Sequence, residues 1–200
     1  CEQAISGAIK ITMEDDHEEL KREVLETDSE IDKKERDIES ICMKLLLRQQ
    51  PVARDLRVIS SALKMISDME RIGDQASDIV ELAQYIKKSD VKYKTHLSDM
   101  ANEVIKMVTK SIKSFVKKDI EMARNVIVYD DVVDNYFEEI KKELIRIISS
   151  GESDGEEFID ILMIAKYLER IGDHATNIAE WVEYAITGVH RNNEHQLGGH

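Results

Sequence analysis

The sequence contains one ten-residue phrase twice, and this internal repeat limits what the chain can fold into. The phrase reads ERIGDQASDI at residues 70–79 and ERIGDHATNI at residues 169–178, so the copies are offset by 99 residues. Upstream of each copy stands a second matched segment, DSEID at 28–32 and DDVVD at 130–134, with an offset of 102 residues. A three-residue difference in the length of one loop accounts for the difference between the two offsets. The repeat therefore predicts two related units.

We predict that the first unit covers residues 1–89 and the second covers 91–190, followed by a polar, disordered tail at 191–200. Apolar residues recur with helical spacing in each unit, which predicts an all-α fold of two tandem three-helix bundles with six helices. The first predicted helix ends near residues 14–16, and the others cover 17–48, 51–87, 92–116, 119–149 and 156–187. The first helix is about ten residues shorter than its counterpart, so we expect a trimmed N-terminus.

Two of the predicted helices carry apolar residues at alternating steps of four and three. This spacing is typical of the seam along which helices of a bundle pack, and we assign these residues to the core. The seams are Met65, Met69, Ile72, Ala76, Ile79, Ala83 and Ile86 in the third helix and Ile164, Leu168, Ile171, Ala175, Ile178, Val182, Ala185 and Val189 in the sixth.

The overall charge restricts the classes of partner. The formal net charge is -13, from 41 acidic and 28 basic residues. Such a surface repels nucleic acid and anionic lipid, so we expect neither as a direct partner. Apolar runs such as ILMIA at 161–165 are too short to cross a bilayer, and no segment resembles a signal peptide. Cys1 and Cys42 form no disulfide framework, which fits a cytoplasmic protein.

The repeated phrase places acids and a glycine on one helix face. A mid-helix glycine costs about 1 kcal/mol relative to alanine, and two acids four residues apart repel by about 0.2–0.5 kcal/mol. Both units contain the glycine and the two acids, so both accept these free-energy costs. The bare backbone at the glycine leaves room between the carboxylates, where cations with bound water would fit. The face consists of Glu70, Gly73, Asp74, Ser77 and Asp78 in the first unit and of Glu169, Gly172, Asp173, Thr176 and Asn177 in the second.

Each unit also carries two aspartates four residues apart, Asp28 with Asp32 and Asp130 with Asp134. The first pair lies 22 and 18 residues before the turn near residue 50, and the two acids of the phrase lie 20 and 24 residues after it. At a rise of ~1.5 Å per residue, all four reach a similar height on antiparallel helices. The heights in the second unit match as well. The angles around the helix axes leave open whether the acids group within each unit or across the two.

Matched acids in both units predict metal binding. Ligand sets made only of oxygen favour magnesium, manganese, calcium or iron, with zinc less suited. His174 stands beside Asp173, but Gln75 takes its place in the first unit, so we interpret His174 as a surface histidine.

Long segments of the chain resemble the phosphate-transport regulatory protein family PhoU. In the first unit the resemblance is carried by DSEIDKKERDIESICMKLLLRQQPVARDLRVISSALKMISDMERIGDQASDIVE, and in the second by DVVDNYFEEIKKELI and LERIGDHATNIAEWVEY. It extends over nearly the whole chain except the tail. It implies two three-helix bundles and metal clusters bound by the acidic motifs. The implied ligands are Asp28, Asp32, Glu70, Asp74, Asp130, Asp134, Glu169 and Asp173, with Asp78 and Asn177 as secondary candidates.

The resemblance also implies a function without catalysis. A protein of this family would link a phosphate importer to a sensor histidine kinase, contacting the importer's ATPase subunit PstB and the kinase PhoR, and would hold signalling down when phosphate is plentiful. A homodimer is consistent with this role. The PVARDLR segment at 51–57 has no clear echo in the second unit. Its Arg54 and Arg57 either pair with a partner's acids or belong to a solvated helix start.

Two alternatives stay open. One is a carboxylate-bridged di-iron oxidase, which needs two Glu-x-x-His pairs facing the core of a bundle. One such pair is present, Glu14 with His17, and it lies at a predicted helix end. The other is a purely structural helical adaptor whose acids bind nothing.

Overall fold

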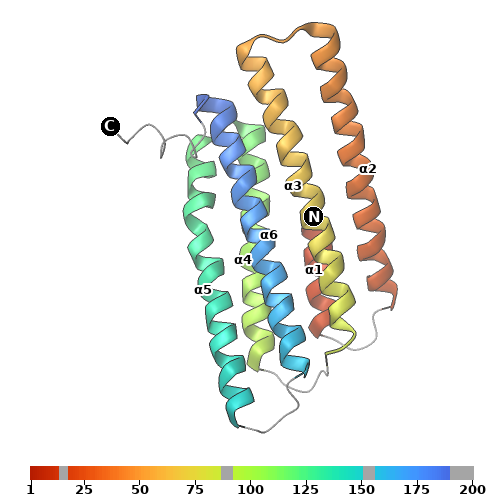
Figure 1. Cartoon of the computed structure of the whole chain (residues 1–200), viewed down its shortest axis with the longest axis vertical. Helices are drawn as coiled ribbons and strands as arrows, with labels where there is room; N and C mark the ends of the chain where they lie inside the picture. Colours follow the sequence, from red (N-terminus) through yellow and green to blue (C-terminus); the bar gives the residue numbers. More distant parts are fainter. Residues whose placement is uncertain (14–17, 87–91, 151–155, 190–200) are drawn as a thin grey trace.

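A computed structural model describes residues 1–13, 18–86, 92–150 and 156–189 (Figure 1). These residues form six α-helices, which confirms the predicted all-α fold. The helices are α1 (Glu2–Met13), α2 (Glu18–Gln49), α3 (Ala53–Ala83), α4 (Lys92–Lys117), α5 (Ile120–Ser150) and α6 (Glu156–Thr187).

The helices pack in two groups of three that share one apolar core. Within the first group α1, α2 and α3 contact one another, and within the second α4, α5 and α6 do the same. The groups meet where α3 packs against α6 and α1 packs against α4. The helices α1, α3, α6 and α4 therefore form a ring, with α2 and α5 on opposite outer sides (Figure 1). Buried residues of both groups belong to one continuous cluster.

The predicted seams lie at the centre of this core. In α3, Ile72, Ala76 and Ile79 are fully buried, and α6 buries its seam residues in the same way. Val189 is the exception: the prediction that it is a core residue is wrong, because α6 ends at Thr187 and the Val189 side chain is 51% exposed.

Helix ends follow the local chemistry of the chain. Pro51 precedes α3 by two residues instead of occupying its first turn, and Val52 is the residue that caps the helix. Lys118, between α4 and α5, adopts a left-handed conformation with φ of 54°, as residues that end helices often do. Asp119 then caps α5, since its Oδ1 accepts a hydrogen bond of 2.9 Å from the Met122 N–H.

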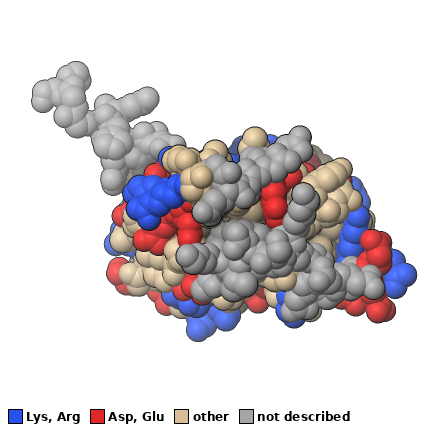
Figure 2. All heavy atoms as spheres, turned by 90° about the horizontal axis from the view of Figure 1, so that it is seen from below, with Lys and Arg blue, Asp and Glu red and all other residues tan. Residues whose placement is uncertain are grey.

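Some predictions lie outside the described residues: the boundary between the units near residue 90, the tail at 191–200 and the Glu14–His17 pair. Across the helices that the structure describes, none combines the length and apolar character needed to cross a membrane. Seen from below, the described part of the surface mixes acidic and basic side chains, with both signs beside one another (Figure 2).

Candidate functional site

The glycine of each repeated phrase faces an aspartate from the neighbouring helix. A methyl group added at Gly73 of α3 would lie 2.7 Å from Asp28 Oδ1 of α2. A methyl group at Gly172 of α6 would lie 3.5 Å from Asp130 Oδ1 of α5. The space that each glycine leaves is therefore occupied by a carboxylate of the facing helix. The acids group within each unit, which settles the question that the helical spacing had left open.

Two clusters of acids result, one in each unit. The first acidic cluster joins α2 to α3, and the second joins α5 to α6. The first cluster comprises Asp28, Asp32, Glu35, Glu70, Asp74 and Asp78, and the second comprises Asp130, Asp134, Glu169 and Asp173.

Asp28 of the first cluster is partly buried. Burial raises its pKa above the ordinary value, and repulsion from Asp74, Asp32 and Asp78 raises it further, whereas the nearby Ser77 hydroxyl lowers it. Asp28 Oδ1 and Ser77 Oγ are both buried, and neither completes a hydrogen bond of good geometry with any described residue. A buried carboxylate oxygen without a donor is costly, and a proton or a cation would satisfy it.

The pKa values of two acids on α3 are also raised. Burial raises the pKa of Glu70, and repulsion from Asp74, Glu35 and Asp32 adds to it. Burial and the neighbouring Glu81 and Asp74 also raise the pKa of Asp78, which Arg170 of α6 partly offsets. Each shift means that the folded state disfavours another negative charge in this cluster.

The second cluster shows a larger effect. Burial, together with repulsion from Asp134 and Asp173, raises the pKa of Asp130 from 3.8 to about 6, against the opposing influence of Thr176. Burial and Glu169 likewise raise the pKa values of Asp134 and Asp173. The cluster therefore carries more negative charge than its surroundings accommodate at neutral pH.

The second cluster contains a lysine whose matched position in the first unit is a serine. Lys166 Nζ forms an ion pair with Glu169 and lies 5.4 Å from the centre of the Phe137 ring. At the equivalent place in the first unit stands Ser67, whose hydroxyl donates to Glu35 Oε1 at 3.4 Å. Basic side chains reach the first cluster as well, since Arg36 lies 3.7 Å from Asp32 and Arg71 lowers the pKa of Glu70.

The sequence analysis did not identify Lys166 and Glu35 as members of the clusters, although their spacing from the predicted ligands indicated it. Lys166 precedes Glu169 by three residues, and Glu35 follows Asp32 by three, so each shares a helix face with a predicted ligand.

Two residues of the second phrase make a different contact. His174 Nδ1 lies 2.9 Å from Asp68 Oδ1 of α3, and both side chains are 14% exposed. The interpretation of His174 as a surface histidine is therefore wrong. Asn177, a secondary metal candidate, donates its side-chain N–H to the same Asp68 oxygen at 3.3 Å. These contacts join α3 to α6, away from the glycine-facing aspartates.

The donor chemistry of the clusters fits a hard cation. Their ligands are carboxylate oxygens, and Asp28 Oδ1 is a buried acceptor that no described residue satisfies. Within the described ranges, no group of three or more His, Cys, Asp or Glu side chains is already arranged around a single point. An ion bound here would take carboxylates from the two facing helices and complete its coordination with water, as magnesium commonly does. The metal roles of the ten candidate residues stay predictions.

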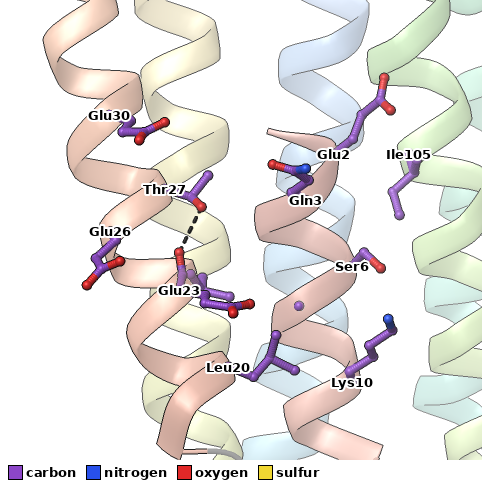
Figure 3. A pocket seen from close by; sticks show the side chains of 12 residues that line it. Glu2, Gln3, Ser6, Lys10, Leu20, Glu23, Glu26, Thr27, Glu30 and Ile105 are labelled. Carbon is purple, nitrogen blue, oxygen red and sulfur yellow. Dashed lines mark hydrogen bonds between the residues drawn. The ribbon is translucent and has the colours of Figure 1, made fainter.

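A separate cavity of about 670 Å³ lies between α1 and α2 (Figure 3). Glu23, Glu26 and Glu30 come from α2, and Lys10 from α1 lies at its lower end. The cavity contains none of the predicted metal ligands, so it is not the candidate site.

Comparison with known proteins identifies the family. Residues 1–83 and 97–182 match the model of the PhoU domain. The chain belongs to the PhoU family. It is 34% identical to the phosphate-specific transport system accessory protein PhoU homolog 1 of Thermotoga maritima, over 93% of this chain and 81% of that protein. It is 33% identical to the PhoU homolog of Pseudomonas aeruginosa, over 94% of this chain and 78% of that protein.

Solved structures of PhoU proteins share the fold. The crystal structure of PhoU from Pseudomonas aeruginosa superposes with a TM-score of 0.85 and 32% identity, covering 94% of this chain and 90% of that one. The phosphate transport system regulatory protein PhoU from Streptococcus pneumoniae superposes with a TM-score of 0.82 at 24% identity, covering 94% and 89%, which shows the fold alone.

Proposed function

We propose that this PhoU-family chain is a metal-binding regulator of phosphate uptake and phosphate-starvation signalling that acts without catalysis. It would work in the cytoplasm, as a homodimer, at the inner face of the membrane through its partners. Those partners would be the importer's ATPase subunit PstB and the sensor histidine kinase PhoR, and the chain would restrain the kinase when phosphate is plentiful. Relatives that are named accessory proteins of the phosphate-specific transport system support this proposal.

One observation carries the metal part of the proposal. In both units an aspartate of one helix lies against the glycine of the next, among acids whose pKa values are raised by burial and mutual repulsion. A divalent cation removes this repulsion, and the clusters contain oxygen ligands that hard cations prefer.

The ion would be held by acids from two helices in each unit. In the first cluster Asp28 and Asp32 of α2 would bind opposite Glu70 and Asp74 of α3. The second cluster would use Asp130, Asp134, Glu169 and Asp173, with Lys166 competing for Glu169. Because the ion joins neighbouring helices, it stabilises the folded state by linkage. Asp78 and Asn177 would support the sites from outside the ligand set.

A double substitution tests the assignment. Asp74→Asn with Asp173→Asn removes one carboxylate from each cluster, and we expect lower metal content in protein purified without chelator. We also expect the rise in thermal midpoint on adding manganese or ferrous ion to disappear. The control is Asp37→Asn with Asp99→Asn, which changes the net charge equally at two exposed positions. Metal content equal to that of the control would refute the metal sites.

The partner assignment is tested separately. We expect tagged protein to recover the importer's ATPase subunit and the sensor kinase from cells, with amounts that differ between high and low phosphate. Recovery of neither at either phosphate level would contradict the signalling role and leave the metal sites untouched.

A further inference from the structure

The lysine of the second acidic cluster has two kinds of neighbour. Lys166 of α6 forms an ion pair with Glu169 one turn further along the helix, and its Nζ lies 5.4 Å from the centre of the Phe137 ring of α5. An ammonium at this distance from an aromatic ring is attracted to it. The Glu169 side chain is only 16% exposed. The ammonium of Lys166 therefore has a largely buried acid of the cluster and a ring of the facing helix as its partners.

The positive charge of Lys166 also acts on other acids of the cluster. Burial and repulsion from Glu169 raise the pKa values of Asp134 on α5 and of Asp173 on α6, and Lys166 opposes both shifts. One cation thus stabilises carboxylates that come from two helices. A metal ion in this cluster would have the same electrostatic effect.

The first unit has a different pair of residues at the matched positions. Ser67 stands 99 residues before Lys166, and Glu35 stands 102 residues before Phe137, which are the two offsets of the repeat. The Ser67 hydroxyl donates to Glu35 Oε1 at 3.4 Å, and repulsion from Glu35 contributes to the raised pKa of Glu70. The two positions therefore carry a charge of −1 in the first unit and +1 in the second.

The basic neighbours of the first cluster are of another kind. Arg36 lies 3.7 Å from Asp32, and the two side chains are 65% and 41% exposed. Exposed pairs of this type contribute little because water and salt screen them. Arg71 lowers the pKa of Glu70, but less than burial and three neighbouring acids raise it. Lys166 differs from these arginines because its acidic partner is largely buried.

We propose that Lys166 is an internal counter-ion of the second cluster, which a divalent cation must displace from Glu169 in order to bind. The Phe137 ring remains as a partner for the displaced ammonium. This inference rests on the proposed metal sites and adds a regulatory property to one of them. The second cluster stays partly neutralised when metal is scarce, and it binds metal more weakly than it would with a serine at position 166.

Removal of the lysine should have two effects of opposite sign. Lys166→Ser introduces the residue of the matched position in the first unit. In the metal-free protein it takes away the counter-charge of Glu169, so we expect a lower thermal midpoint. In the presence of metal it takes away the competitor, so we expect tighter binding. A lysine with a merely structural role would lower the midpoint without raising the affinity for metal.

Manganese binding measures the effect at the second cluster. The background is Asp32→Asn with Asp74→Asn, which removes one carboxylate of the first cluster from each of its two helices. Chelator-treated protein is titrated at pH 7.5, and the electron paramagnetic resonance signal reports free manganese. We expect Lys166→Ser to tighten binding on the order of tenfold, since one unit charge close to the ion is removed. The control is Lys113→Ser, which makes the same charge change at an exposed position of α4 and should not alter the affinity.

Two further variants separate charge from side-chain size. Lys166→Arg keeps the positive charge, so we expect it to leave manganese binding weak. Ser67→Lys places a cation at the matched, exposed position of the first cluster. In a background of Asp134→Asn with Asp173→Asn, we expect Ser67→Lys to weaken binding to the first cluster on the order of tenfold.

The outcomes distinguish this inference from the proposal on which it rests. If chelator-treated wild-type protein binds no manganese, the metal sites and the role of Lys166 are both overturned. If the wild type binds manganese and Lys166→Ser leaves the affinity of the second cluster unchanged, only the role of Lys166 is overturned. Equal tightening in Lys166→Ser and Lys113→Ser would also overturn it, because the effect would then come from the net charge of the protein.

Discussion

At the scale of single residues, the two glycines of the repeated phrase have similar sequence contexts and different surroundings. The sequence predicted space beside each glycine, and in the structure an aspartate of the facing helix lies beside it. Periodicity along one helix shows where a glycine leaves space, but it does not show which residue of the neighbouring helix lies in that space. That the acids of two helices lie at one level was therefore predictable, whereas the packing of an aspartate against each glycine was not.

Alanine substitutions at the glycines should have different consequences. In Gly73→Ala the new methyl group would meet Asp28 Oδ1 at 2.7 Å, which forces the carboxylate outward. In Gly172→Ala the nearest atom is Val133 Cγ1 at 3.3 Å, and Asp130 Oδ1 at 3.5 Å is in ordinary contact. We expect Gly73→Ala to return the pKa of Asp28 toward its ordinary value, because the displaced carboxyl gains solvent, and Gly172→Ala to leave the pKa of Asp130 raised.

Carbon-detected NMR titration of the aspartate carboxyls measures both values. The wild-type protein provides the reference, and each variant serves as the control for the other because the substitution is the same. An unchanged Asp28 pKa in folded Gly73→Ala would show that the glycine does not hold this carboxylate in place.

At the scale of helices, residue counts and apolar periodicity predicted the heights of the acids well. The helical rise placed the acids of α2 and α3 at one height because each residue adds a nearly constant length. The angle around each axis was harder to predict, since a helix turns about 100° per residue and small errors accumulate over twenty residues. Convergence of Asp28 on Gly73 depends on that angle, which packing between helices determines.

The contact between α3 and α6 was missed for a related reason. Gln75 and His174 occupy the same place in the two phrases, and both flank the apolar seam. Gln75 is 6% exposed, and the His174 side chain is 14% exposed. Each follows a seam isoleucine by three residues and precedes another by four, a spacing that favours the buried side of a helix. The presence of Gln75 at the matching position had suggested that His174 lies at the surface.

Removing the His174 contact should weaken the packing of α3 on α6. In His174→Ala the mostly buried Asp68 loses its 2.9 Å partner and keeps the 3.3 Å hydrogen bond from Asn177, so we expect the loss of one hydrogen bond, about 0.5–1.5 kcal/mol. We expect a double-mutant cycle with Asp68→Asn, measured by urea unfolding, to give a coupling energy above about 0.5 kcal/mol.

The control cycle uses Lys141 and Glu138, which form a 2.6 Å ion pair on the solvent side of α5 with side chains 39% and 46% exposed. Exposed pairs at this spacing contribute about 0.3–0.5 kcal/mol. A His174–Asp68 coupling no larger than that of the control would mean that the contact does not hold the two groups together.

At the scale of the whole molecule, the acidic clusters should set how stability depends on pH. Folding raises the pKa of Asp130 from 3.8 to about 6, so between these values the folded state holds a proton that the unfolded state has lost. The free energy of unfolding therefore falls as pH rises from about 4 to about 6 and stays lower above that range. The raised pKa values of Asp28, Glu70, Asp78, Asp134 and Asp173 act in the same direction.

A bound cation should reverse this trend, because it compensates the charges that become unfavourable above pH 6. We expect metal-free protein to be less stable at pH 7.5 than at pH 5, with Asp130 contributing on the order of 1–2 kcal/mol after solvent screening. Manganese should raise the thermal midpoint more at pH 7.5, where protons no longer compete for the carboxylates. Asp130→Asn should flatten the pH profile of the metal-free protein, whereas Asp37→Asn, at an exposed position of α2, should not. Equal stabilisation by manganese at both pH values would mean that the ion binds away from these clusters.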